Sequence, residues 1–285
     1  MCLALTAAIV AVPALGACSP GGTARDSIET PTTAVGPGAD EPTTVAVPAS
    51  GGVGASRPGA TGGTDPVSST TDDGPHELLA PPPTVRPALE RDGDMAPLVR
   101  RVDTTDRVIF ITIDDGQVRD PAALDHLLEL GLPFTSFLTE PLAEADPSFW
   151  KGTQAAWGMI ETHTINHVNL REAGEATQRR EICEPAATFE GLFGRRPTLF
   201  RPPYGNSSDS VRRIAAGCGY DAVVLWTGST NNETLTMQEV ALRPGDIVLV
   251  HYRDTLRADI DAILERARAE GFTIGRLEDY LSPGR

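Results

Sequence analysis

The sequence predicts an α/β fold in which strands and helices alternate around a parallel sheet that is either open or closed into a barrel. Short apolar runs alternate with segments of helical spacing over 107–281. Five of these runs end on polar or aromatic residues, as strands do when a site lies at their carboxyl ends. The composition changes near residue 97, so the fold is expected to occupy only 97–285.

The amino-terminal region predicts export and a tether. Residues 1–17 form a short apolar leader, and 15–18, Leu-Gly-Ala-Cys, resembles the lipobox of bacterial lipoproteins, which would make Cys18 the lipidated residue. An ordinary secretory signal is the alternative. Residues 18–96 are rich in Pro, Gly, Thr and Ser, which predicts a disordered tether. We therefore expect a membrane-anchored protein facing the cell wall, or a secreted one.

The charge balance narrows the class of partner. The 285-residue chain has a formal net charge of −15. Binding to nucleic acid or to anionic lipid requires a basic face, so this charge argues against both partners. A neutral or amine-bearing polymer fits better, and we expect a monomer.

Local signals define the first strand and helix. The apolar run over 108–111 predicts a strand that leads to Asp114, Asp115 and a turn at Gly116. Asp120 and Pro121 have the pattern of an N-cap and a first helical position, and the helix over 122–130 should stop at Gly131.

The later elements follow from the same periodicities, apart from a poorly marked helix over 141–156 and a short apolar run over 157–160. The remaining expected elements are, in chain order, a strand over 134–138, a helix over 172–193 that Gly194 ends, a strand over 198–200, a helix over 208–216, strands over 222–225 and 247–250, a helix over 256–269, a strand over 272–274 and a helix over 277–281.

Two histidines suggest a metal site. His163 and His167 are four residues apart, a spacing that would place both imidazoles on one face of a helical turn. With a carboxylate from the first strand they would make a two-His-one-Asp set with open positions, as in catalytic zinc sites. Two polar histidines on a solvated helix are the alternative. An Asp-Asp-Gly sequence is by itself equally typical of a plain turn.

Several strand ends are expected to converge. In a β/α barrel the carboxyl ends of all strands share one face, so residues at these ends become neighbours. The residues predicted to gather there are Asp114, Asp115, His163, His167, Arg201, Tyr204, Trp226 and His251. This convergence makes several weak motifs into one stronger candidate site.

Five motifs carry a family resemblance. They are Thr-Ile-Asp-Asp-Gly (112–116), His-Thr-Ile-Asn-His (163–167), Arg-Pro-Pro-Tyr-Gly (201–205), Trp226, and Ile-Val-Leu-Val-His (247–251). In order and spacing they resemble the polysaccharide deacetylases with a NodB-homology domain, carbohydrate esterase family 4. The resemblance implies a distorted (β/α) barrel that removes N- or O-acetyl groups from sugars with a divalent metal.

Residue by residue, the resemblance implies a metal centre and a base. Asp115, His163 and His167 would hold the metal, with zinc as the first choice and Co, Ni, Mn or Fe as the others. Asp114 would be the general base, and Arg201 would pair with it and keep it oriented.

The resemblance also assigns the rest of the pocket. The backbone N–H of Tyr204 would stabilise the oxyanion, and His251 would protonate the leaving group. Trp226 and Leu249 would form the wall around the acetyl methyl group, although an apolar residue at a strand end can also serve the core alone.

Two motifs depart from the family pattern. Relatives commonly have Gly-Asn before the first histidine, where this chain has Glu161 and Thr162. The fourth motif lacks the carboxylate that would accompany His251, and Asp246 and Asp254 are the nearby candidates for its partner. The second departure bears on rate and substrate range more than on the type of reaction.

Two cysteines remain in the folded region. Cys183 and Cys218 are predicted to lie in helices that flank one strand. In an exported protein such a pair is expected to form a disulfide, with two free buried thiols as the alternative.

Together these features predict a metal-dependent hydrolase that deacetylates N-acetylated glycans, with peptidoglycan as the nearest available polymer. An esterase for O-acetylated, xylan-like sugars would use the same residues. A glycan-binding lipoprotein without catalysis is the alternative from another class.

Overall fold

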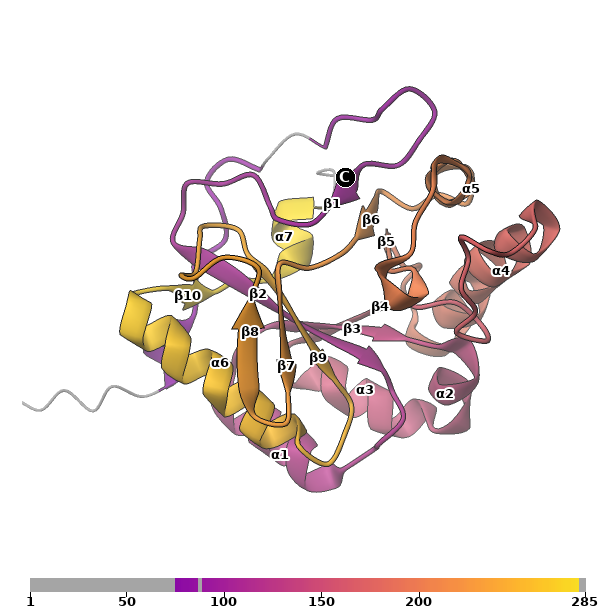
Figure 1. Cartoon of the computed structure of the whole chain (residues 1–285). Helices are drawn as coiled ribbons and strands as arrows, with labels where there is room; N and C mark the ends of the chain where they lie inside the picture. The colour runs from indigo at the N-terminus through magenta and orange to yellow at the C-terminus, as the bar shows by residue number, and fades with distance from the viewer. Residues whose placement is uncertain (1–74, 87–88, 282–285) are drawn as a thin grey trace, which may run out of the picture. The chain divides into compact units, whose positions relative to one another are not determined.

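The computed structural model of the protein describes residues 75–86 and 89–281, and Figure 1 shows the path of the chain. The leader, Cys18 and most of the expected tether lie outside the described residues. Among the described residues, no helix combines the length and apolar character needed to span a membrane.

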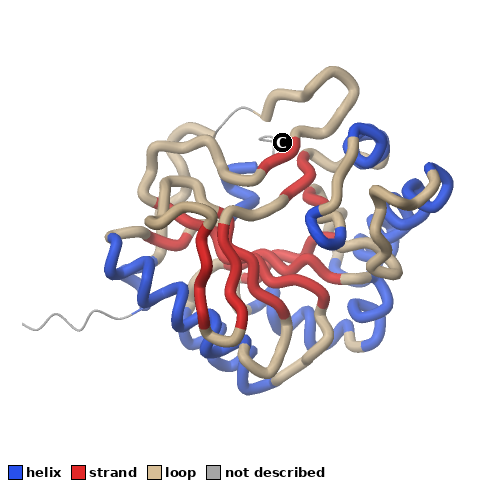
Figure 2. The backbone as a smooth tube through the Cα atoms, in the orientation of Figure 1, coloured by secondary structure: helices blue, strands red, loops and turns tan. Residues whose placement is uncertain are grey.

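One sheet organises the domain (Figure 2). Its strand order is β1-β6-β5-β4-β3-β2-β9-β7-β8, with β10 also paired to β2, and all pairings except β7 with β8 are parallel. The strands are β1 (Leu98–Val99), β2 (Val108–Asp115), β3 (Phe134–Leu138), β4 (Gly158–Thr162), β5 (Leu199–Phe200), β6 (Ala222–Val224), β7 (Gly228–Asn231), β8 (Thr234–Met237), β9 (Ile247–His251) and β10 (Thr273–Ile274). The sheet curls into a half-barrel, in agreement with the distorted barrel that the family resemblance implied, and it brings the carboxyl ends of β2, β4 and β9 together.

All the α-helices but the last pack on the outside of this sheet (Figure 1), whereas the last one packs against apolar side chains inside its curve. They are α1 (Pro121–Leu130), α2 (Glu140–Ala145), α3 (Pro147–Ala155), α4 (Glu175–Phe193), α5 (Asp209–Gly217), α6 (Leu256–Glu270) and α7 (Leu277–Leu281), with 3-10 turns at Pro75–Leu78 and Pro203–Gly205. The apolar side chains between helices and sheet form a core. The central strands β2 and β9 are buried along almost their whole length as a result.

Capping signals were decisive for the helix boundaries. Asp120 caps α1 by accepting a hydrogen bond from the Ala122 N–H, and Gly131 ends the helix in the left-handed conformation. The single helix expected over 141–156 is instead two helices. Asp146 has a φ of −151° and a ψ of 74°, outside the helical region, and ends α2. Pro147, which cannot continue α2, starts α3 with Asp146 as its cap.

The folded region begins earlier than residue 97, where the sequence placed the end of the tether. Leu78 is buried, and Leu79 forms a β-bridge with Ile274. The Ala80 N–H donates to the Ile274 carbonyl at 2.9 Å. A short apolar stretch next to a free edge of β10 is enough to hold this segment, although its surroundings have the composition of a linker.

A hairpin that the sequence did not predict occupies the region of the divergent fourth motif. Strands β7 and β8 are joined by Asn232 and Glu233, which have φ of 47° and 66°. Positive φ at both central residues gives the tight turn that suits antiparallel strands. The Glu233 N–H donates to buried Asp259 of α6 at 2.8 Å, which holds the hairpin against that helix.

The predicted cysteine pair forms a disulfide that joins α4 and α5. Cys183 lies in α4, Cys218 follows α5, and their Cα atoms are 5.3 Å apart. The bond closes a loop of 35 residues in sequence separation, which includes the Arg201 turn. Cross-linking a loop of this length restricts the unfolded chain.

We expect the Cys183→Ala, Cys218→Ala double variant to lose about 2–4 kcal/mol in free energy of unfolding relative to the oxidised protein. Guanidinium denaturation without reductant measures this difference. Equal values for the two proteins would show that the sulfur atoms are not joined in solution.

A buried carboxyl group lies inside the sheet, near the amino end of β3. Glu278 of α7 is 6% exposed and accepts a hydrogen bond from the Thr135 hydroxyl at 2.7 Å, while its second oxygen has no partner among the described residues. Burial raises the pKa of Glu278 to about 8, and the neighbouring Glu161 carboxylate adds to this increase. Glu278 is therefore protonated in the folded protein at neutral pH.

This pKa predicts how stability depends on pH. The unfolded carboxyl ionises near its ordinary value of 4.5 and the folded one near 8, so the free energy of unfolding should fall as pH rises between these values. Glu278→Gln removes this effect. We expect the stability of the wild-type protein relative to the variant to fall by up to ~1.4 kcal/mol per pH unit in this range. Denaturation at several pH values tests this, with exposed Glu129→Gln as a control that shows no such trend.

Candidate functional site

Two adjacent carboxylates at the end of β2 have different surroundings. Asp114 is 2% exposed and accepts a hydrogen bond from Arg201 at 2.6 Å. Asp115 has a φ of 76°, in the left-handed region that Asp tolerates better than most residues. The change of backbone conformation between them gives each carboxylate its own partners.

Arg201 is the hub of the buried part of the site. Its guanidinium is completely buried and donates to Asp114, to the Thr112 hydroxyl at 2.9 Å, and to the carbonyls of Val224 and Leu225 at 3.3 Å each. Burial raises the pKa of Asp114 above its ordinary value, and Arg201 opposes this increase. The pairing predicted for these two residues is therefore present in the structure.

The same arginine orients a histidine through its main chain. The Nδ1–H of His163 donates to the Arg201 carbonyl at 2.7 Å, because a carbonyl can only accept. This tautomer leaves the Nε2 lone pair free, 3.7 Å from Asp115 Oδ1. Burial lowers the pKa of His163 to about 3, so its ring is neutral, as a metal ligand must be.

The two histidines do not lie on a helical turn, as their spacing predicted. They belong to an irregular loop after β4, in which Thr164 and His167 have φ of 71° and 52°. The Thr164 hydroxyl accepts a hydrogen bond from the His167 N–H at 3.0 Å and closes the loop. The histidines are nevertheless neighbours, with ring centroids 4.9 Å apart.

Glu181 supports this loop and was missed in the sequence. It is fully buried on α4, and its Oε2 accepts the N–H groups of Ile165 at 3.1 Å and Asn166 at 2.8 Å. Its Oε1 accepts the Asn166 side-chain amide at 2.7 Å. The available signal was a charged residue on the apolar face of a helix, between Gln178 and Ile182.

Asp115, His163 and His167 fit a divalent metal. One potential ligand atom from each lies within 4.8 Å of the others, and Asp115 Oδ1 is 3.4 Å from His167 Nε2. Asp115 Oδ1 is buried without a hydrogen-bond partner among the described residues. A buried, unpartnered carboxylate oxygen is costly unless a cation binds it, and two imidazoles with one carboxylate suit zinc and similar metals.

His251 lies at the end of β9, directly opposite Asp114 in the strand pairing. Leu249, which is opposite Thr112, is buried on the same side of the sheet. Burial lowers the pKa of His251, and the negative charges of Asp114 and Asp115 oppose this. The predicted acid and base therefore face the same space.

Neither candidate partner of His251 is confirmed. Asp246 lies at the opposite end of β9, where its Oδ1 accepts hydrogen bonds from Arg101 at 2.7 Å and from Thr227 at 2.8 Å. Asp254 is exposed. No described carboxylate lies within hydrogen-bonding distance of the His251 ring. The charges that favour its protonated form are therefore those of Asp114 and Asp115, which act through space.

The turn after β5 and the end of β6 complete the site. Tyr204 has a φ of 61° in the 3-10 turn, and its exposed ring packs against His167 with centroids 4.7 Å apart. The Trp226 ring lies 5.6 Å from the Arg201 guanidinium carbon. A Cβ on Gly205 would lie 3.1 Å from Trp226, and Gly205 has a φ of 68°, so the tight contact and the backbone conformation both favour glycine.

Comparisons with known proteins agree on the family. A family model described as polysaccharide deacetylase matches residues 101–223. An uncharacterised protein of Streptomyces coelicolor is 36% identical over 199 residues, which cover 67% of this chain and 80% of the relative. The peptidoglycan-N-acetylglucosamine deacetylase of Bacillus cereus is 27% identical over 195 residues, covering 63% of this chain and 91% of the relative.

A solved structure supports the fold. It is a carbohydrate esterase family 4 pseudoenzyme from Bacillus anthracis, 20% identical, with a TM-score of 0.57 over 67% of this chain and 71% of that protein. At this identity the likeness concerns the arrangement of strands and helices and not the activity. Taken with the sequence relatives and the geometry of the strand ends, it leads to one conclusion: the chain belongs to the polysaccharide deacetylase family.

Proposed function

We propose that this protein is a metal-dependent hydrolase that removes acetyl groups from N-acetylated cell-wall glycans. The observation that carries the proposal is the pair of adjacent carboxylates with separate environments. Asp115 has a buried oxygen without a partner, beside two imidazoles, while Asp114 is paired with Arg201. This division of roles is what hydrolysis assisted by a metal requires.

Asp115, His163 and His167 would hold the metal, with zinc as our first choice. A divalent cation at this position supplies a Lewis acid and lowers the pKa of nearby water. Asp114 takes a proton from the water that attacks the acetyl carbon. Arg201 fixes the carboxylate for this transfer, and burial makes it a stronger base.

Residues on the other strands complete the hydrolysis. The backbone N–H of Tyr204 donates to the oxyanion, on a turn that two prolines stiffen. His251 gives a proton to the leaving nitrogen as the bond between nitrogen and acetyl carbon breaks, so the products are acetate and a free amine. Trp226 and Leu249 surround the acetyl methyl group.

We further propose that the substrate is peptidoglycan and that the protein acts at the cell surface. The name of the Bacillus cereus relative supports the substrate. The leader and the Pro/Gly/Thr-rich segment support a domain that a lipid on Cys18 anchors and that reaches the wall on a flexible tether.

Acetate release with substitutions of the two aspartates tests the proposed function. Chitooligosaccharides, peptidoglycan fragments and acetylxylan serve as substrates, with EDTA treatment followed by addition of zinc. Asp115→Ala should lose both bound metal and activity, because it removes a ligand. Asp114→Asn should retain its metal but lose about 10²–10⁴-fold in kcat, because it removes the base.

The exposed Asp103→Asn variant is the matched control and should behave as the wild-type protein does. Asp115→Ala with normal metal content and normal acetate release would refute the assignment. Release from acetylxylan alone would favour the esterase. Absence of release from every substrate, with metal bound, would favour a glycan-binding protein without catalysis.

Glu181→Gln tests how the metal-binding loop is held. All the groups that face Glu181 from the loop are hydrogen-bond donors, so an amide N–H in place of one oxygen would oppose one of them. We expect zinc affinity to fall about 10–100-fold, as for other residues that support metal ligands. Competition with a chromophoric chelator measures this affinity without relying on activity.

Asp259→Asn is the control for this variant. Asp259 is also buried on a helix and accepts a backbone N–H, but from the β7–β8 hairpin. It should reduce stability without a change in zinc affinity. Unchanged zinc affinity in Glu181→Gln would refute the supporting role.

A further inference from the structure

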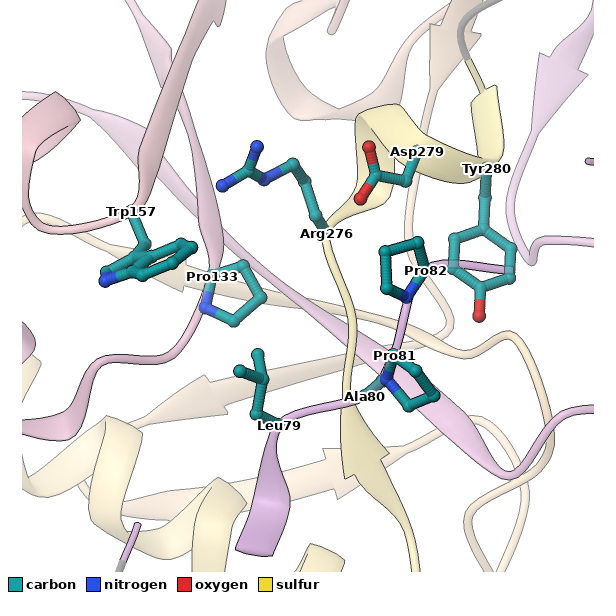
Figure 3. Close-up of a pocket in the computed structure, with 9 residues that line it drawn as sticks. All are labelled: Leu79, Ala80, Pro81, Pro82, Pro133, Trp157, Arg276, Asp279 and Tyr280. Atoms are coloured by element: carbon teal, nitrogen blue, oxygen red, sulfur yellow. The ribbon is translucent and has the colours of Figure 1, made fainter. Parts of the chain in front are cut away.

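A second concave site lies at the amino ends of the strands, and Figure 3 shows the residues that line it. The pocket has a volume of about 170 Å³ and is lined by Pro81, Pro133, Trp157, Arg276 and Asp279, among others. Pro133 and Trp157 directly precede β3 and β4, whose first residues are paired in register. His163 and His167 follow the carboxyl end of β4, so the length of that strand separates them from Trp157 at its amino end.

Trp157 stands at a position that normally suits glycine. It follows the C-cap of α3 with a φ of 66°, the left-handed conformation in which glycine ends many helices. A bulky aromatic residue is strained in this conformation. Its side chain is also 50% exposed, so burial in the core recovers only part of this cost. The backbone and the core therefore do not explain a tryptophan here.

The polar groups of the pocket are placed around this ring. The guanidinium carbon of Arg276 lies 5.8 Å from the centre of the Trp157 ring, and Arg276 forms no ion pair with any described residue. Asp279 lines the same pocket from the other side (Figure 3). The pocket thus offers an aromatic ring, a cationic donor beside it that has no ion-pair partner among the described residues, and an anionic acceptor.

These groups match the chemistry of a sugar ring. A pyranose presents an apolar face of C–H groups, suited to packing on an aromatic ring, and a rim of hydroxyl groups that both donate and accept. A polyanion would be repelled by Asp279 and by the net charge of −15. A purely apolar ligand would leave Arg276 and Asp279 without partners.

We propose that this pocket is a second carbohydrate site, which binds a saccharide unit of the polymer whose acetyl groups are removed at the metal-binding site. The inference rests on the proposed function for the identity of the polymer. A site of this kind keeps the domain on an insoluble glycan while the catalytic residues act on another part of it.

Trp157→Gly gives the sharpest test, because glycine suits the backbone at this position. We expect the full-length variant to unfold at an equal or higher temperature, and its retention on insoluble peptidoglycan and its affinity for chitohexaose to fall at least tenfold. Acetate release from a chitobiose-sized substrate should not change. Leu128→Ala, an exposed apolar side chain on α1, is the control and should bind as the wild-type protein does.

Arg276→Gln is the second variant, and it should bind several-fold more weakly without a change in acetate release from the small substrate. Unchanged retention in both variants would overturn the proposal. A lower unfolding temperature that accounts for the loss of binding in Trp157→Gly would also overturn it. Failure of the wild-type protein to release acetate would refute the proposed function instead, and binding by the variants would still decide the question of this pocket.

Discussion

The buried ion pair between Asp114 and Arg201 is the constraint on which the rest of the site depends. An ionised group inside a protein is tolerated only with a matched partner and with its remaining hydrogen bonds satisfied. Arg201 meets this condition by reaching β2 through Asp114 and the end of β6 through Val224 and Leu225. Its own carbonyl fixes the tautomer of His163. One residue therefore sets the orientation of both the Asp114 carboxylate and the His163 ring.

At the end of β2, two adjacent carboxylates have different environments. Asp114 points to the buried, paired side, and the left-handed backbone of Asp115 directs the next carboxylate toward the histidine loop. The loop itself has little regular structure, so its shape depends on Thr164 and on the buried carboxylate of Glu181. Rigid strands supply one half of the site and a supported loop supplies the other half.

The sequence predicted the parts of this arrangement that periodicity and strand ends encode. The strand before Asp114, the helix caps of α1 and the convergence at His251 follow from local patterns. The conformation of the His163–His167 loop could not be predicted, because it depends on Glu181, which is distant in sequence. The β7–β8 hairpin was missed because its turn uses Asn232 and Glu233 without the usual glycine, and because Asp259 supplies the support.

The backbone of Asp115 also suggests how an inactive descendant of this fold could arise. Asn and Gly also adopt the left-handed conformation readily. A codon for either residue differs from one for Asp by a single base. Either replacement would remove the proposed metal-binding carboxylate and leave the chain path intact. Selection for the fold alone would not oppose such a change, so the position offers a short evolutionary route from the proposed hydrolase to a protein that only binds glycans.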